Sequence, residues 1–384
     1  MKKIRDTISK LKDLLFIGSA NVTGTAIGAA FWFLIASFLT TEEYGEISYI
    51  ISIGSIVAAI ASLGVPGTIL VYTAKGEKVQ ASYYFISIVA GLVSSIVLFI
   101  IFEKIELGLY VIGYVIFSLA VSDILGRKKY KDYSKYLISQ KIIFVTLALT
   151  LYFLIGPSGI ILGFALSFFP YIIRIIIGFK ESQIKKSILK LHFRFTLNNY
   201  ANDLSRSLSG NLDKLIIGPL LGFALLGNYA LGLQFLSLLA ILPNIVFQYI
   251  LPQEASGNPS KRMKKFTILI SVGIATLGSI LGPTILPIFL PNYGEAGDVI
   301  RIISFAVIPI TINLMYKSKF LSNNKSFPAL LGAITFVIIQ VLGIITLGQL
   351  YTVNGIAMSL LIAASSETLL LVILDQYLKR KKLS

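Results

Sequence analysis

Residues 198–221 form an apolar stretch that is interrupted by acidic, basic and amide side chains. At about 100° per residue, Asn199, Asp203, Arg206 and Lys214 fall on one stripe of a helix. A charge at mid-membrane depth costs at least about 2.5 kcal/mol, so this stripe does not face lipid. Two arrangements are open. Either the stripe lines a water-filled cavity, or Asp203 and Arg206, three residues apart, neutralise each other as an intramembrane ion pair.

Further polar groups lie in other apolar stretches. Asn21 and Thr25 lie in the first one and predict either substrate contacts or close helix packing. Glu367 lies in the last one and predicts either a cation or proton site or a salt bridge. Asp213 is a second candidate for ion coupling, with a packing role equally open.

The composition excludes a soluble domain. Of the 384 residues, 55% are hydrophobic and 14% are charged, and the mean hydropathy is +0.83. A soluble domain usually carries about a quarter charged residues, so this chain has too few polar groups to cover its surface. The absence of cysteine excludes thiolate metal sites. With one histidine, no Walker lysine loop and short loops without paired carboxylates, we expect no metal, no cofactor and no enzymatic activity.

Long apolar runs occur along the whole chain. A hydrocarbon core about 30 Å thick needs about 20 apolar residues per helix. Runs of this length predict an all-α polytopic membrane protein with about twelve transmembrane helices. The predicted segments are 14–40, 45–73, 81–102, 107–125, 137–155, 159–179, 198–221, 225–250, 265–290, 297–316, 327–349 and 353–377.

Basic residues concentrate in the two termini and in every second loop, among them 126–141, whereas the opposite loops contain mainly Glu and Asp. Because cytoplasmic loops carry an excess of Lys and Arg, we expect both termini in the cytoplasm and the protein in the cytoplasmic membrane. This placement also accounts for the net charge of +16 through contacts with anionic membrane lipids. Nucleic-acid binding is therefore not expected.

The two halves of the chain share features. Residues 1–13 and 180–197 are each predicted to form a basic amphipathic helix at the cytoplasmic interface, with His192 of the second solvated. About 182 residues separate the glycines of Glu43-Tyr44-Gly45 and Leu226-Gly227-Asn228-Tyr229. The chain thus predicts two six-helix lobes, related as parallel repeats, around a central cavity. The lobes are 14–179 and 198–377, followed by a basic tail, 378–384.

Short motifs accompany the predicted helices, together with the basic amphipathic start. They are Leu39-Thr40-Thr41-Glu42-Glu43-Tyr44-Gly45, Leu63-Gly64-Val65-Pro66 with Ala74, Asn211-Leu212-Asp213-Lys214-Leu215-Ile216-Ile217-Gly218, Leu226-Gly227-Asn228-Tyr229 and Pro252-Gln253-Glu254. With these motifs the chain resembles, over essentially its whole length, the polysaccharide-export flippases of the multidrug/oligosaccharidyl-lipid/polysaccharide (MOP) exporter superfamily, transporters of lipid-linked oligosaccharides.

The resemblance implies that a cationic cavity between the lobes holds the headgroup of a polyprenyl-pyrophosphate-linked glycan, which is moved by alternating access. Because a guanidinium binds phosphate bidentately, Arg206 is the first candidate for the phosphate contact and Lys214 the second. Asp203 is expected to hold Arg206 when the site is empty, and Asn199, Asn21 and Thr25 are further cavity candidates.

Glycan-assembly proteins are further expected partners. Three other functions are open. The first is a MATE-like multidrug antiporter, which typically needs a carboxylate in the first lobe, where 14–40 has none. The second is a peptidoglycan-precursor flippase, and the third is a polytopic enzyme of glycan assembly.

Overall fold

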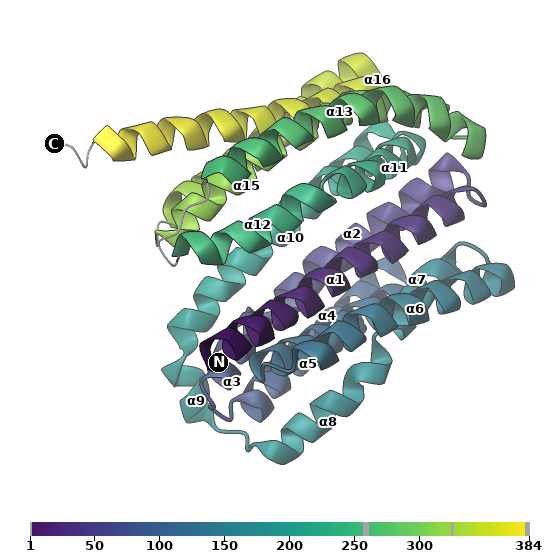
Figure 1. Ribbon diagram of the computed structural model, residues 1–384. Helices are drawn as coiled ribbons and strands as arrows, with labels where there is room; N and C mark the ends of the chain where they lie inside the picture. The colour runs from purple at the N-terminus through teal and green to yellow at the C-terminus, as the bar shows by residue number, and fades with distance from the viewer. Residues whose placement is uncertain (1, 256–260, 324–325, 381–384) are drawn as a thin grey trace. The chain divides into compact units, whose positions relative to one another are not determined.

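The computed structural model describes residues 2–255, 261–323 and 326–380, with side chains from residue 18 onward except 252, 255 and 326. These ranges consist of helices joined by short turns (Figure 1). The α-helices are α1 (Lys2–Ala36), α2 (Thr41–Ser62), α3 (Val65–Ala74), α4 (Gln80–Phe102), α5 (Ile105–Gly126), α6 (Tyr130–Ile155), α7 (Ser158–Leu166), α8 (Ile172–Glu181), α9 (Lys186–Leu191), α10 (Phe193–Leu221), α11 (Phe223–Leu239), α12 (Ile241–Ala255), α13 (Lys261–Phe289), α14 (Gly294–Ile303), α15 (Val307–Ser322) and α16 (Ser326–Arg380). Two short 3-10 helices are η1 (Phe169–Tyr171) and η2 (Ser304–Ala306).

Nine helices of the described ranges are long and apolar enough to cross a membrane, and ten if α11 and α12, which meet at a 48° bend, form one span. The sequence predicts about twelve, and the difference has two causes. α16 counts once although it contains two helices, and α10 is not counted because charged and amide residues occupy much of its length. The chain is an all-α, multi-pass membrane protein.

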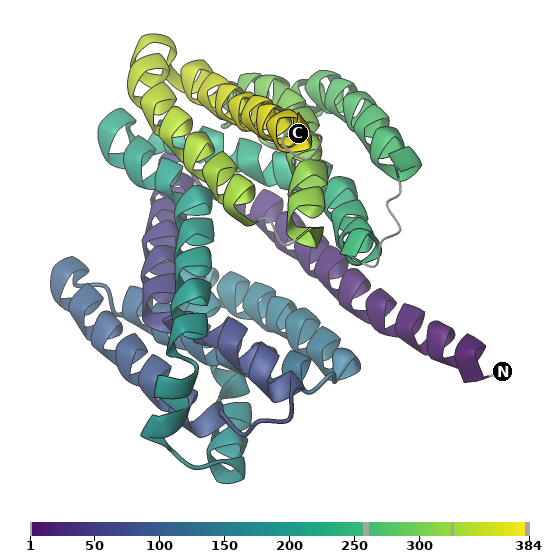
Figure 2. The ribbon, with the colours of Figure 1, turned by 90° about the vertical axis from the view of Figure 1, so that its left-hand side faces the viewer.

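α16 is interrupted at Tyr351 and Thr352, whose backbone angles are not helical. The two halves turn back on one another, as Figure 2 shows. Gly343 in the first half leaves no room for a Cβ beside Ser359 in the second half, so the halves pack closely. The break predicted between the last two apolar runs is thereby confirmed.

The single span predicted over 45–73 is wrong, because this segment forms two helices. α2 ends at Ser62 and α3 begins at Val65. Leu63 and Gly64 between them have φ angles of 53° and 68°, a left-handed conformation that ends a helix. Proline then lies in the first turn of α3, where the missing amide hydrogen costs nothing.

The continuous amphipathic helix predicted over 180–197 is also wrong. Ser182 is extended, and helix resumes only in the six residues of α9 and again in α10. Two hydrogen bonds tie the extended part to the start of α4. The Ala81 amide donates to Ser182 Oγ at 2.8 Å, and the Lys185 amide donates to Ser82 Oγ at 2.9 Å. Serine side chains thus satisfy one backbone donor in the first turn of α4, which has no partner within its own helix, and one in the extended segment.

The predicted lead-in, 1–13, is helical over residues 2–13 and continues into α1 without a break. Its side chains lie outside the described residues, so its amphipathic character stays a prediction. Of the predicted tail, 378–380 closes α16 and 381–384 lies outside the described residues.

The chain divides into two compact units. The first comprises Met1–Phe31 and Tyr49–Asn211, and the second comprises Trp32–Ser48 and Leu212–Ser384. α1, α2 and α10 therefore contribute residues to both units. The predicted boundaries of the two lobes stay a prediction.

In the second unit, two glycines of the sequence motifs lie in direct backbone contact. A Cβ on Gly45 of α2 would meet the carbonyl of Phe223, and a Cβ on Gly227 of α11 would meet the carbonyl of Thr41. Only glycine lets two helices approach this closely. The two positions that the internal repeat relates therefore pack against each other.

The turn before α2 is fixed by a capping box. The Thr40 amide donates to Glu43 Oε2 at 2.8 Å, and the Glu43 amide donates to Thr40 Oγ1 at 3.2 Å. The Tyr293 hydroxyl donates to the carbonyls of Leu39 and Thr40, both at 3.3 Å. Burial and, secondly, the Glu43 carboxylate raise the pKa of the Tyr293 phenol, which keeps it protonated as a donor. The Thr-Thr-Glu-Glu motif thus has a structural role.

Candidate functional site

α10 carries the predicted polar stripe, and α2 and α3 hold its first half within the first unit. A Cβ on Gly64, just before α3, would meet the backbone of Thr196, so glycine lets α10 lie directly on this turn. The Thr68 hydroxyl donates to Thr196 Oγ1 at 3.0 Å. The Ser207 hydroxyl donates to the carbonyl of Ser55 in α2 at 3.2 Å. These contacts fix the rotation of α10 about its own axis.

Asn199 faces α3. Its Nδ2 donates to Thr68 Oγ1 at 3.4 Å, and its amide packs against Gly67. The side chain is half-buried by these contacts. The observed contacts of Asn199 are therefore with the protein, and its predicted role in binding stays a prediction.

Asp203 is half-buried and Arg206 is exposed, and both lie near Tyr114 of α5. Within the described part of the chain, neither Asp203 nor Arg206 forms a hydrogen bond or an ion pair. The predicted ion pair between them is therefore not formed. An i, i+3 pair contributes only about 0.2–0.5 kcal/mol on a helix surface, too little to hold two flexible side chains together. The guanidinium of Arg206 remains available to an anion.

Asn21 and Thr25 belong to the same unit but lie on α1. The Thr25 hydroxyl is exposed and donates to the carbonyl of Asn21 at 2.8 Å, within its own helix. No hydrogen bond among the described residues joins either side chain to the stripe on α10. The structure thus does not bring these candidates into direct contact with Arg206.

Asp213 belongs to the second unit and is a buried carboxylate, with 6% of its surface exposed. The Tyr229 hydroxyl donates to its Oδ2 at 2.9 Å, and Gln340 Nε2 donates to the same oxygen at 3.3 Å. Oδ1 accepts from the backbone amide of Lys214 at 2.8 Å, and the Lys214 ammonium lies 3.5 Å away. Asp213 thus joins α10, α11 and α16 through neutral donors, with the Lys214 ammonium as a longer ion-pair partner.

Glu367, in the second half of α16, is 5% exposed and paired. Its Oε1 lies 2.7 Å from the Lys317 ammonium of α15, and its Oε2 accepts from Asn313 Nδ2 at 2.8 Å. The Thr368 hydroxyl donates to Asn313 Oδ1 at 2.7 Å, which fixes the orientation of that amide. Of the two arrangements open for Glu367, the salt bridge is the one formed. Its role in ion coupling stays a prediction.

The sequence predicts that His192 is solvated, and this prediction is wrong. Only 7% of the surface of His192 is exposed. Its Nε2 lies 2.9 Å from Glu77 Oε2, and its ring packs on Tyr72 with 3.6 Å between the centroids. Both partners follow or end α3, more than a hundred residues earlier. No local pattern in the sequence indicates this contact.

Lys141 lies where two predictions overlap, the basic loop 126–141 and the apolar segment 137–155. The structure places it inside α6, in agreement with the apolar segment. Its ammonium lies 5.7 Å from the centroid of the Phe164 ring. The first unit therefore contains an intramembrane cation besides Arg206. The signal available in the sequence is that apolar residues already begin at Tyr136 and Leu137.

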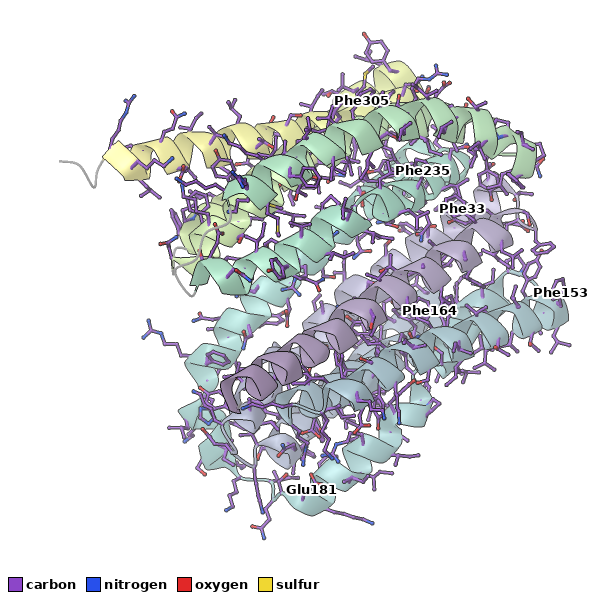
Figure 3. All side chains as sticks on the ribbon, viewed as in Figure 1. Phe33, Phe153, Phe164, Glu181, Phe235 and Phe305 are labelled. Carbon is purple, nitrogen blue, oxygen red and sulfur yellow. The ribbon has the colours of Figure 1, made fainter. Side chains whose placement is uncertain are left out.

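The second unit contains an apolar cavity of about 820 Å³. α1, α11 and α13 line it, with Phe33 and Phe235, labelled in Figure 3, on two of its sides. Ser37 is its single polar lining residue, and none of the predicted site residues reaches it. The cavity is therefore separate from the charged groups described above.

Comparison with solved structures gives the fold. An inward-facing multidrug resistance MATE family transporter of the MOP superfamily superposes with a TM-score of 0.67 at 17% identity, covering 97% of this chain and 99% of that one. An outward-facing structure of such a transporter gives 0.62 at 15% identity and 97% of each chain. A MOP superfamily transporter from Pyrococcus furiosus, described by the reverse polarity of its binding pocket, gives 0.61 at 13% identity and 95% of each chain.

Comparison by sequence gives the family. No curated protein matches the chain significantly. A family model described as "Polysaccharide biosynthesis protein" matches residues 34–257, more than half of the 384 residues. The chain, which has the fold of the MOP superfamily transporters, therefore belongs to this polysaccharide biosynthesis protein family.

Proposed function

We propose that this protein is a flippase, which moves a lipid-linked oligosaccharide or polysaccharide precursor across the cytoplasmic membrane by alternating access. Membership of the polysaccharide biosynthesis protein family supports a glycan as the cargo. The transporter fold supports transport without a catalysed reaction. Among the residues of this chain, Arg206 is the main support for the proposal. It is an exposed cation on a helix of a membrane protein, and no hydrogen bond or ion pair within the described residues occupies it.

The chemistry of the substrate fits this group. A sugar–phosphate head cannot cross hydrocarbon unaided, because each buried charge must be paired or hydrated. The planar guanidinium of Arg206 offers two parallel N–H donors to one phosphate. The polyprenyl chain stays in the lipid, so only the headgroup needs protein. Asp203, Asn199, Asn21, Thr25 and Lys214 are proposed as further polar contacts along its path.

For coupling to an ion gradient, Asp213 is the better supported candidate. Its carboxylate is buried among neutral donors and its only ion pair within the described residues is the long one to Lys214, so a proton or cation can exchange there. Glu367 is already neutralised at close range by Lys317. We therefore assign coupling to Asp213 before Glu367.

A MATE-like cation antiporter is the second candidate, because the superposed structures include such transporters. It differs in the charge of its cargo. A cationic cargo is repelled by an unpaired Arg206, whereas an anionic headgroup is bound by it. The free guanidinium therefore favours the flippase.

One reconstitution experiment separates these functions. Purified protein is placed in vesicles with a polyprenyl-diphosphate-linked oligosaccharide that carries a fluorophore, and a membrane-impermeant quencher reports how fast the inner-leaflet pool becomes accessible. We expect fast exchange in protein-containing vesicles and slow exchange in empty ones. Accumulation of a fluorescent lipophilic cation against a proton gradient, without glycan exchange, would instead establish the antiporter.

The proposed orientation has its own test. A reporter that is active only in the cytoplasm is fused after Lys131, after Lys261, after Glu43 or after Glu295. Because basic loops stay on the cytoplasmic side, the first two fusions are expected to be active and the last two silent. Activity at the acidic positions would reverse the proposed topology.

A further inference from the structure

Lys141 lies deep in the apolar part of the first unit. From Lys141 to the end of α6 at Ile155 the helix rises about 21 Å at 1.5 Å per residue, within a hydrocarbon core of about 30 Å. The contact with α1 also lies well inside that helix. The Lys141 Cγ lies 3.8 Å from the position of a Cβ on Gly24, and α1 rises about 18 Å from Gly24 to its end at Ala36.

The surroundings of Lys141 are aromatic and lack an anion. Its stem packs on Gly24 of α1, and its ammonium lies 5.7 Å from the ring centroid of Phe164. Figure 3 shows Phe164 partway along the helices of this unit, well away from Phe153 near the end of α6. Among the described residues, Lys141 forms no ion pair or hydrogen bond with a carboxylate. A single cation–π contact is weaker than the cost of a lysine in hydrocarbon, so a negative partner is missing.

A row of rings runs from Lys141 toward Arg206. Phe164 lies 5.2 Å from Tyr110, and Tyr110 stacks on Tyr114 at 6.3 Å, measured between centroids. Tyr114 lies near Arg206 on α10. Tyr110 is buried, while Phe164 is partly and Tyr114 more than a third exposed, so rings are accessible near both cations.

Arg206 lies on α10 and Lys141 on α6, and both residues belong to the first unit. Two steps between rings, from Phe164 to Tyr110 and from Tyr110 to Tyr114, lie between the two cations, so they form two cationic positions rather than one. A molecule that meets both must carry two anionic groups, with apolar ring faces between them.

We propose that Lys141 binds an anionic substituent of the glycan itself, a carboxylate or a phosphate, distinct from the linking phosphate at Arg206. The cargo class is thus an acidic lipid-linked glycan, whose sugar rings pack on Tyr114 and Phe164. This inference rests on the proposed flippase function and adds its specificity. Lys141 is a residue that selects the cargo by charge.

The test uses two cargoes with the same polyprenyl diphosphate. One carries a uronic acid and the other its methyl ester, which removes the charge and keeps the sugar. In vesicles, wild-type protein is expected to exchange the acidic cargo about tenfold faster, the size of one charge-assisted hydrogen bond. Lys141→Gln is expected to lower the rate for the acidic cargo about tenfold and leave the ester unchanged, and Lys141→Arg to keep the preference.

Lys135→Gln is the matched control, because Lys135 is exposed on the same helix and is expected to leave both rates unchanged. Equal wild-type rates for the two cargoes, or a preference that survives Lys141→Gln, would overturn the inference and leave the flippase proposal intact. Equal losses for both cargoes with reduced protein abundance would assign Lys141 a structural role and also overturn the inference.

If wild-type protein moves neither cargo, the proposed function itself fails. Preference for an anionic phospholipid over the acidic glycan would identify the ligand as a membrane headgroup and overturn the assignment to glycan.

Discussion

Arg206→Gln is expected to lower the rate of lipid-linked glycan exchange at least about tenfold while the amount of protein in the membrane stays normal. The loss removes a charge-assisted contact to phosphate, worth about 1.5–3 kcal/mol, and each 1.4 kcal/mol is about a factor of ten. The fold does not depend on this side chain, which is exposed and makes no hydrogen bond or ion pair within the described residues. Exchange in reconstituted vesicles and abundance by immunoblot are measured on the same preparation.

Arg206→Lys separates charge from geometry. Lysine keeps the positive charge but loses the planar fork of donors, so an intermediate rate is expected. Arg194→Gln serves as the control, because Arg194 is exposed near the start of the same helix and is expected to leave exchange unchanged. A well-folded Arg206→Gln protein that exchanges glycan at the wild-type rate would show that Arg206 does not bind the phosphate. A loss of abundance in proportion to the loss of exchange would show a structural role instead.

Local features of the fold follow from local patterns. The apolar runs predict the helices, and the gap between the last two runs coincides with the non-helical Tyr351 and Thr352. The same reasoning misses the break at Leu63 and Gly64, because the residues on both sides are apolar and hydropathy does not register a positive φ. The hydropathy pattern thus does not predict the backbone conformation at single positions, which is the first limit of the sequence-based prediction.

Contacts between distant segments are the second limit. The repeat marks Gly45 and Gly227 as equivalent positions, but only the fold shows that they lie against each other. The basic neighbours of His192 in the sequence predict a solvated side chain, but it is buried because it packs on Tyr72 of α3 and contacts Glu77 in the loop after α3. Lys141 lies in both a predicted basic loop and a predicted apolar segment, and only the fold shows that it packs on Gly24 of α1.

The candidate site illustrates both what local patterns predict and what they do not. Helical spacing predicts that the charged and amide positions of α10 share one stripe, since spacing depends only on the helix period. Spacing does not determine the partner of each group. Asn199 turns to Thr68, Arg206 stays free of Asp203, and Asp213 meets donors from two other helices.

Glu367→Gln is expected to lower the free energy of unfolding by about 3 kcal/mol, because it leaves the Lys317 ammonium without its counter-charge in a largely buried position. The carboxylate oxygen now lies 2.7 Å from that ammonium, and the side chain of Glu367 is 6% exposed. Denaturant titration of the purified protein measures the change. Asp298→Asn is the control. Asp298 and Arg301 are 3.7 Å apart and exposed by 55% and 62%, so we expect a change below about 1 kcal/mol.

The double variant Glu367→Gln with Lys317→Met separates structure from ion coupling at this position. Removing both charges leaves no unpaired ion, so stability is expected to return to within about 1 kcal/mol of the wild type. If Glu367 serves only as a counter-charge, gradient-driven exchange returns with stability, and coupling is left to Asp213. Restored stability with exchange that no longer responds to the gradient would instead make Glu367 the coupling residue. A double variant no more stable than Glu367→Gln alone would contradict the ion pair as the reason for the loss, since the lysine would then cost nothing when unpaired.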